Sequence, residues 1–311
     1  MAKTDALDHT ARIARSRADK VFDLCNYTIL SAILLIVLYP LYFIVISSFS
    51  EPTAVNSGNV SLWPKGFTLE GYRIILQNHD VWRGYANTFL YTVMDVALSL
   101  AIMIPGGYAL SRKELDGRNV FMVLIVFTMF FSGGMIPTYM VVKNLGMVDT
   151  IWALFVPTAA SAYYVIVVRT FFQNTLPEEM LESAKVDGCS TFRFFFSMVI
   201  PLSAPIIAVM ALFTAVSQWN SFFSALIYLH DADLYPLQLI LRSILISSQM
   251  SAHGTDAVVD PETIVEAQRY AELIKYALIM VASVPVLALY PFLQRFFVKG
   301  MMIELRSTSN E

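Results

Sequence analysis

Charge is scarce in this sequence. Asp, Glu, Lys and Arg make up 14% of its 311 residues, whereas a typical soluble domain carries roughly 25%. Five long stretches contain none of these four residue types, and a sixth contains Asp95 alone. Crossing ~30 Å of hydrocarbon takes roughly 20 apolar residues in a helix, and a soluble protein with six such stretches would keep too little polar surface. We therefore predict an all-α integral membrane protein with six transmembrane helices, within residues 24–50, 84–110, 119–142, 150–168, 194–229 and 276–294.

Several patterns of catalytic and metal sites are also missing. The two cysteines, Cys25 and Cys189, form no closely spaced even set that would predict a disulfide framework. His79, His230 and His253 are isolated, and their spacing matches no metal site. The sequence has no G-x-x-x-x-G-K-(S/T) phosphate-binding loop, no Ser/His/Asp arrangement and no paired carboxylates. We expect no catalytic site, metal or cofactor on this chain, and no nucleic-acid partner.

Basic residues are distributed unevenly between the segments that join the predicted helices. If the N-terminus lies inside the cell, the inner segments hold fourteen Lys and Arg residues and the outer segments hold seven. The positive-inside rule then places both termini in the cytoplasm. The resulting parts are a cytoplasmic N-terminal segment 1–26, a six-helix membrane domain 27–298 and a cytoplasmic tail 299–311, with a cytoplasmic loop 171–201 and external loops 51–83 and 231–270.

The second external loop contains an apolar pattern with helical spacing. Leucines and isoleucines recur there every three or four residues, which predicts an amphipathic helix. Two interpretations of its apolar face stay open, namely packing on the lipid interface and docking of an external partner. The residues concerned are Leu237, Ile240, Leu241, Ile244 and Leu245.

The predicted cytoplasmic loop contains the segment ESAKVDGCSTFRFFFSMVIPL, which begins at Glu182. A helix starts just before it, at Pro177-Glu178-Glu179, because proline is favoured at the first helical position and acidic side chains suit the positive N-terminal end. We expect Gly188 to end this helix in a left-handed cap. The charged and polar residues of the segment therefore lie on a short, structured helix and not on a loose connector.

A second short helix is expected after Gly188. Ser190 and Thr191 are suited to cap it, and Pro201 ends the turn that leads into the fifth membrane helix. The segment is therefore a helix–Gly–helix elbow with a polar surface and an apolar back. Its aromatic residues need burial against the inner ends of the membrane helices, and they are Phe192, Phe194, Phe195 and Phe196.

The elbow also carries a family resemblance. Glu182-Ser183-Ala184, then Asp187-Gly188 and Pro201-Leu202, resemble the E-A-A…D-G…L-P motif of ATP-binding-cassette importer permeases. Two positions depart from that motif, since Ser183 replaces the usual first alanine and Cys189 replaces the alanine after the glycine. Both substitutes are small, so helix packing should survive.

The resemblance assigns roles to the residues of the elbow. In that family the first short helix is the coupling helix, which lies in a cleft of the nucleotide-binding subunit and transmits its closure to the membrane helices. The resemblance implies that Gly188 allows the sharp turn and that Ala184 permits close approach. It also implies that Glu182 and Asp187 offer carboxylates to the partner, and local helix capping is the alternative for these two acids.

Three further segments resemble carbohydrate-uptake permeases: NTFLYTV (87–93), FSGGMIPTYMVVKNLGMVDTIWALFVP (131–157) and YPFLQRFFVKGMMI (290–303). The resemblance covers nearly the whole chain and is greatest to the second permeases of systems for complex or uronate-containing oligosaccharides, of which the alginate importers are one example. It implies the type I importer fold and half of a translocation path in a bacterial inner membrane. It also implies a second permease in a heterodimer, two ATPase subunits that hold ATP and Mg, and an external solute-binding protein.

Polar residues inside the predicted spans are candidates for the translocation path. Asp95 lies mid-helix, where a charge should face protein or water; sugar binding, partner pairing and a structural hydrogen bond all stay open. Gln218-Trp219-Asn220 offers an aromatic face and amide groups to a sugar, with interhelical contacts or interfacial anchoring as the alternative. Asn87 and Tyr91 are weaker candidates for the same lining.

Other functions remain as alternatives. Within the same family the solute could be a peptide or an amino acid. A secondary transporter or channel that works alone would need several intramembrane ionisable groups, whereas Asp95 is the single one within the six stretches. A membrane-bound enzyme would need a cluster of catalytic side chains, which the sequence lacks.

The third predicted span contains residues that disturb a helix. We expect Gly133-Gly134 and Pro137 to interrupt it.

Overall fold

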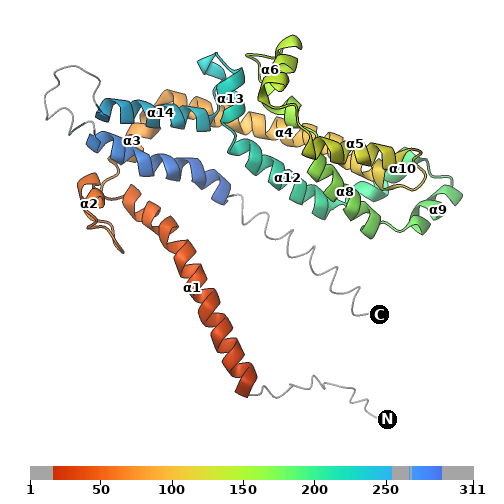
Figure 1. Ribbon diagram of the computed structural model, residues 1–311, viewed down its shortest axis with the longest axis horizontal. Helices are drawn as coiled ribbons and strands as arrows, with labels where there is room; N and C mark the ends of the chain where they lie inside the picture. The colour runs from red at the N-terminus through yellow and green to blue at the C-terminus, as the bar shows by residue number, and fades with distance from the viewer. Residues whose placement is uncertain (1–16, 254–265, 267, 289–311) are drawn as a thin grey trace, which may run out of the picture. The chain divides into compact units, whose positions relative to one another are not determined.

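The computed structural model describes residues 17–253, 266 and 268–288, and within these ranges the regular structure is helical. The chain divides into two compact units, residues 1–68 and 69–311. Figure 1 shows the described helices of both units.

The first unit consists of one long helix and a short folded loop. Helix α1 spans Arg17–Ser48 and α2 spans Pro52–Asn56. The apolar side chains of α1 are exposed along most of its length within the unit, as expected of a helix that meets lipid or partner helices. The loop folds back on the end of α1, where the rings of Phe49 and Phe67 stack at 5.9 Å.

The second unit is organised around the long helix α4, His79–Ser111. Helices α8 (Ala162–Thr175), α12 (Ala204–Trp219) and α14 (Leu237–His253) all pack against it. The remaining described elements are α3 (Glu70–Gln77), α5 (Arg118–Phe130), α6 (Met135–Asn144), α7 (Trp152–Phe155), η1 (Val156–Thr158), α9 (Glu178–Val186), α10 (Thr191–Phe194), the π-helical turn η2 (Phe195–Val199), α11 (Ile200–Leu202), α13 (Phe223–Tyr228), η3 (Ala232–Leu234) and a final helix Gln268–Ala288.

Close contact between α4 and α8 depends on a glycine. A Cβ atom built on Gly107 would lie 2.6 Å from Cγ1 of Val168. This is well inside van der Waals contact, so a larger side chain at position 107 would force the two helices apart. The missing side chain therefore sets the distance between the central helix and its main neighbour.

Within the described ranges, three helices are long and apolar enough to cross a membrane, and they are Asp19–Ser48, His79–Ser111 and Gln268–Ala288. Three further helix pairs pass the same test together, and each is bent at a short break. The bends measure 115°, 51° and 74° for the pairs that begin at Arg118, Trp152 and Thr191. If each bent pair is one span, the total is six, which agrees with the all-α fold predicted from the sequence.

The breaks follow from the local sequence. Gly134 has a φ of 83° between α5 and α6, a backbone conformation that favours glycine. Pro137 lies within α6, so the prediction of an interruption is confirmed for the glycine pair but not for this proline. Pro201 and Pro205 flank the break at Ser203, where a ring nitrogen cannot donate the helical hydrogen bond.

The amphipathic helix predicted in the second external loop forms as α14. Its apolar face is buried inside the unit, with Leu237, Ile240 and Leu241 at 0–5% exposure in one cluster with Ile75 and Ile274. Within the unit this face packs on α4 and shares one cluster with residues of α3 and of the helix Gln268–Ala288. Contact of this helix with lipid or with an external partner stays a prediction. The periodicity identified the buried face but not its neighbour.

Candidate functional site

The elbow between α9 and α10 has the geometry that its sequence predicts. Gly188 has a φ of 72°, and its N–H donates to the Lys185 carbonyl at 3.0 Å while Cys189 N–H donates to the Ala184 carbonyl at 2.8 Å. These two bonds form a Schellman cap, which ends α9 sharply. The Ser190 hydroxyl accepts from the Arg193 N–H at 3.3 Å and begins α10, as expected.

One face of the elbow is anchored in the core. Leu181 and Ala184 of α9 belong to a buried cluster that also contains residues of α4, α8 and α12. The aromatic residues of the second helix divide between two faces. Phe194 and Phe195 are buried, but Phe192 and Phe196 are 79% and 64% exposed. The expectation that all four would be buried is wrong, because residues at i and i+4 share one helical face and this pair faces outward.

The opposite face of α9 carries most of the motif. Glu182, Ser183, Asp187 and Gly188 are exposed, and Val186 is 88% exposed among them. Neither acidic side chain has an ion-pair or hydrogen-bond partner among the described residues, and Ser190 provides the cap of α10. Local capping by these acids therefore finds no support in the geometry. Their contact with a partner stays a prediction.

Two ion pairs join α9 to the turn 112–117 that follows α4. Lys113 Nζ lies 2.9 Å from Glu178 Oε2, and Lys185 Nζ lies 2.5 Å from Glu114 Oε1. All four side chains are substantially exposed, so each pair adds at most about 1 kcal/mol to stability. Their importance is geometric, because they hold both ends of α9 against one turn. Pro201, the last motif residue, is exposed in α11 just before the 74° bend.

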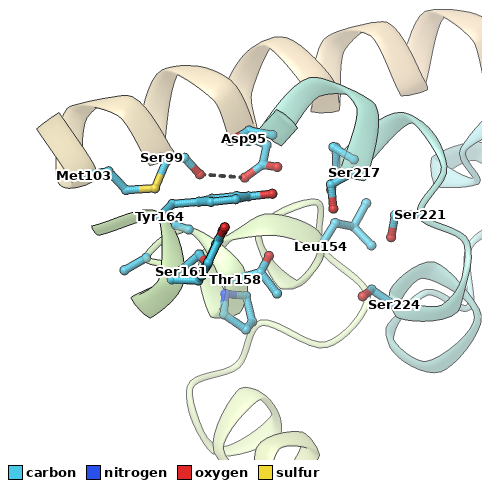
Figure 2. A pocket seen from close by; sticks show the side chains of 16 residues that line it. Asp95, Ser99, Met103, Leu154, Thr158, Ser161, Tyr164, Ser217, Ser221 and Ser224 are labelled. Carbon is cyan, nitrogen blue, oxygen red and sulfur yellow. Dashed lines mark hydrogen bonds between the residues drawn. The ribbon is translucent and has the colours of Figure 1, made fainter. Parts of the chain in front are cut away.

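A polar cavity of about 510 Å³ lies among α4, η1, α8 and α12. Asp95 is 5% exposed on its α4 wall and accepts a hydrogen bond from the Ser99 hydroxyl at 3.1 Å. Figure 2 shows this pair opposite the break between η1 and α8, with α12 forming the third side. Hydroxyl-bearing side chains dominate the polar lining, and they are Ser99, Thr158, Ser161, Tyr163, Tyr164, Thr214, Ser217, Ser221 and Ser224.

The structure brings together two of the six residues predicted for the translocation path. Asp95 and Gln218 both line the cavity. Trp219 is buried beside it in another cluster, where its Nε1 donates to the Ala282 carbonyl at 3.1 Å. Asn220 donates from Nδ2 to the Val216 carbonyl of its own helix at 2.8 Å. The role of these residues in transport stays a prediction.

The two weaker candidates, Asn87 and Tyr91, bind a segment of the chain outside the cavity. We call residues 230–237 the strap. Asn87 Nδ2 donates to the carbonyls of Asp233 at 2.7 Å and Tyr235 at 3.1 Å, and the Tyr91 hydroxyl donates to the Leu234 carbonyl at 3.0 Å. One face of α4 therefore fixes the strap through its backbone.

Asp149 holds the beginning of the strap from the other side. Its Oδ1 accepts the N–H groups of His230 at 2.8 Å and Asp231 at 2.9 Å, and its own N–H donates to the Tyr228 carbonyl at 2.8 Å. The backbone hydrogen bonds from Asp231 and then His230 lower the pKa of Asp149, since they stabilise the ionised form. Asp149 has a φ of 60°, a strained conformation that these bonds hold in place.

Sequence reasoning missed most of the cavity. Thr214, Ser217 and Ser221 of the α12 side all line it, and their spacing of three to four residues forms a polar stripe on one helical face. A stripe of small polar residues in a span without charges was the available signal. Among the described residues no group of His, Cys, Asp and Glu side chains could hold a metal ion.

Residues 74–303 match the model of a protein family described as "Binding-protein-dependent transport system inner membrane component". The chain belongs to this family. It is therefore a permease subunit of an ATP-binding-cassette importer system, as the elbow motif predicted. The apolar helices fit a multi-pass membrane protein.

Relatives of known name match the permease over almost its full length. Protein LplC of Bacillus subtilis (strain 168) is 40% identical over 93% of this chain and 95% of that protein. The polygalacturonan/rhamnogalacturonan transport system permease protein YtcP of the same strain is 40% identical over 92% of this chain and 98% of that protein.

A solved structure has the same fold. It is the crystal structure of a bacterial ABC transporter involved in the import of the acidic polysaccharide alginate. One of its chains matches the permease with a TM-score of 0.79 and 32% sequence identity, and the match covers 91% of this chain and 99% of that chain. The predicted fold of a type I importer permease is thereby confirmed.

Proposed function

We propose that this permease forms half of the path of an importer for oligosaccharides that contain acidic sugars. A second permease supplies the other half, two ATPase subunits bind ATP and Mg, and an external solute-binding protein delivers the sugar. This chain itself is non-catalytic and has both termini in the cytoplasm of a bacterial cell.

The observation that carries the substrate class is the full-length similarity to permeases of sugar-polymer systems. The hydroxyl-rich cavity is compatible with it. Hydroxyl groups both donate and accept hydrogen bonds, so a lining of this kind complements the hydroxyl groups of a sugar. A cavity of about 510 Å³ also lies within the usual range of small-molecule sites, roughly 300–1,000 Å³.

The elbow supports a role in coupling to the ATPase. The buried face of α9 fixes the helix to the core, while Glu182 and Asp187 point away from it without partners among the described residues. An unpaired acid on an anchored helix is suited to meet a cationic group of another subunit. Ser183 and Ala184 keep the helix narrow, Gly188 sets the turn, and Pro201 connects the elbow to the next span.

The coupling role is tested with the complete importer in proteoliposomes. We expect Glu182→Lys to lower sugar uptake at least tenfold and to abolish the stimulation of ATP hydrolysis by the loaded binding protein, because the charge reversal repels the partner. Asp116→Lys is the matched control, since Asp116 is another exposed acid in the neighbouring turn 112–117. Equal uptake and equal stimulation in the Glu182→Lys importer would disprove the role.

The same preparation separates the proposed substrate from its rivals. Uptake of peptides or amino acids, without uptake of oligosaccharides, would show that the substrate class is wrong. Transport by the isolated permease, with no ATPase present, would show that it is a transporter that works alone.

A further inference from the structure

The cavity lining contains one carboxyl group, that of Asp95, and no basic side chain among the described residues. Ser99 donates one hydrogen bond to Asp95 Oδ1, which leaves most of the acceptor positions of the carboxylate open. A ligand in the cavity would therefore have to donate hydrogen bonds to the buried carboxyl group of Asp95.

Thr214 is a second open group, on the α12 wall of the cavity. Its side chain is 5% exposed, and its hydroxyl has no hydrogen-bond partner among the described residues although it lies on the cavity. An unsatisfied buried hydroxyl costs about 1–3 kcal/mol. A ligand hydroxyl or a water molecule would relieve this cost, so the site is open to polar, uncharged groups from both walls.

We propose that Asp95 makes the cavity selective for the uncharged, hydroxyl-bearing edge of a sugar and excludes sugar carboxylates from this side of the path. The proposal rests on the proposed function and specifies which part of an acidic oligosaccharide contacts this subunit. The carboxylates of the sugar then face the rest of the path, which the second permease forms.

The selectivity follows from the sign of the charge. A sugar hydroxyl can donate to the carboxylate of Asp95, and hydrogen bonds to an ionised acceptor are roughly twice as strong as those between neutral groups. A sugar carboxylate cannot donate, and two like charges a few ångströms apart at an interface repel each other by several kcal/mol. Figure 2 shows Ser217 and Ser221 on the α12 side of the same space, where they offer further neutral hydroxyl groups.

The test compares a charged and an uncharged probe built on the same sugar chain. These are trigalacturonate and the same trisaccharide with all its carboxyl groups methyl-esterified. Uptake of each probe is measured with the complete importer in proteoliposomes at saturating loaded binding protein. The readout is the ratio of ester uptake to acid uptake. The binding protein is the same for the wild type and every variant, so its own preference between the probes does not change this comparison.

We expect Asp95→Asn to lower this ratio about tenfold, which corresponds to about 1.4 kcal/mol. Asp95→Glu, which keeps the charge, should preserve the ratio. Thr214→Val should lower the uptake of both probes without changing the ratio. Thr92→Val is its matched control, because the buried hydroxyl of Thr92 also finds no partner in the described part of the chain but lies on α4 outside the cavity lining.

A second variant covers the case in which Asp95→Asn fails to assemble. Ser217→Lys places a cation on the α12 wall and should lower the ratio in the same direction. Uptake of both probes with an unchanged ratio in the variant that assembles overturns the selectivity, while the proposed function stands. Uptake of neither probe by the wild type contradicts the proposed function itself, and the inference fails with it.

Discussion

The elbow and the strap are both short connections rich in acidic residues, but they differ in how far their polar groups are hydrogen-bonded within the chain. The strap's backbone groups are bound by α4 and by Asp149. The elbow satisfies its backbone through the Gly188 cap and leaves Glu182 and Asp187 exposed without described partners. Polar groups satisfied within the chain fix its geometry, whereas those left open on an anchored surface are available to another molecule.

The difference lies in where each segment finds its hydrogen bonds. The bonds of the elbow join residues that are three to five positions apart, so the sequence nearby determines its shape. The strap is held by α4 residues more than 140 positions away, such as Asn87 and Tyr91. We therefore expect changes at the elbow to affect coupling and changes at the strap to affect stability.

The largest effect is expected from Gly188→Pro. Proline requires a φ near −65° and has no N–H, whereas Gly188 has a φ of 72° and donates to Lys185. The lost cap should cost about 3 kcal/mol locally. Uptake should fall more than tenfold while the permease still inserts and ATP hydrolysis becomes insensitive to the loaded binding protein.

Gly188→Ala is the control for this change. No atom lies within 4 Å of the position where its Cβ would be built, so alanine brings only the cost of the left-handed conformation, about 1–2 kcal/mol. Its uptake should lie between the wild type and the proline variant. If the proline variant takes up sugar at the wild-type rate, the elbow does not couple transport to ATP hydrolysis.

An intermediate effect is expected where α4 supports the end of the strap. Thr88 is 2% exposed, and its hydroxyl accepts the N–H of Leu237, the first residue of α14, at 2.8 Å. Thr88→Val keeps the shape and leaves this buried N–H unpaired, which costs about 1–3 kcal/mol. Thermal unfolding of the permease in detergent measures the loss. Thr92→Val, which removes a buried hydroxyl without a partner among the described residues, should not lower the transition; equal losses in the two variants would argue against the role of Thr88.

The smallest effect is expected at Asp149, and it depends on pH. The pKa of Asp149 is lower in the folded protein than its usual value because Asp231 and His230 donate to it. Its contribution to stability is therefore complete above about pH 4 and is lost as the pH falls through the lowered pKa. Asp149→Asn keeps an oxygen acceptor and tolerates a positive φ, but it removes this titration.

Hydrogen exchange at the His230 and Asp231 amides reports the effect at Asp149. Protection in the wild type should decrease on acidification below about pH 4, after correction for the intrinsic exchange rate. Protection in the asparagine variant should be lower at neutral pH and should change little on acidification. The same acid response in both proteins would show that another group is responsible.

Local chemistry made the fold and the elbow predictable from the sequence. The uncharged stretches indicated the spans, and Gly188 and Ser190 indicated the cap and the next helix. Phe192 and Phe196 were wrongly predicted to be buried, because the prediction considered that they are aromatic but not which side of the helix they face. The partners of Asn87, Tyr91 and α14 could not be predicted, since periodicity shows which face is buried but not what covers it.

Helix α4 joins the three regions along one continuous element. It carries Asn87 at the strap, Asp95 at the cavity and the turn 112–117 whose ion pairs hold α9. We expect a displacement of that turn to be passed along the axis of α4 to the position of Asp95. Pro105 lies between the turn and Asp95, and its ring nitrogen cannot donate a helical hydrogen bond, so we expect α4 to bend most easily at this point, between the elbow contacts and the cavity.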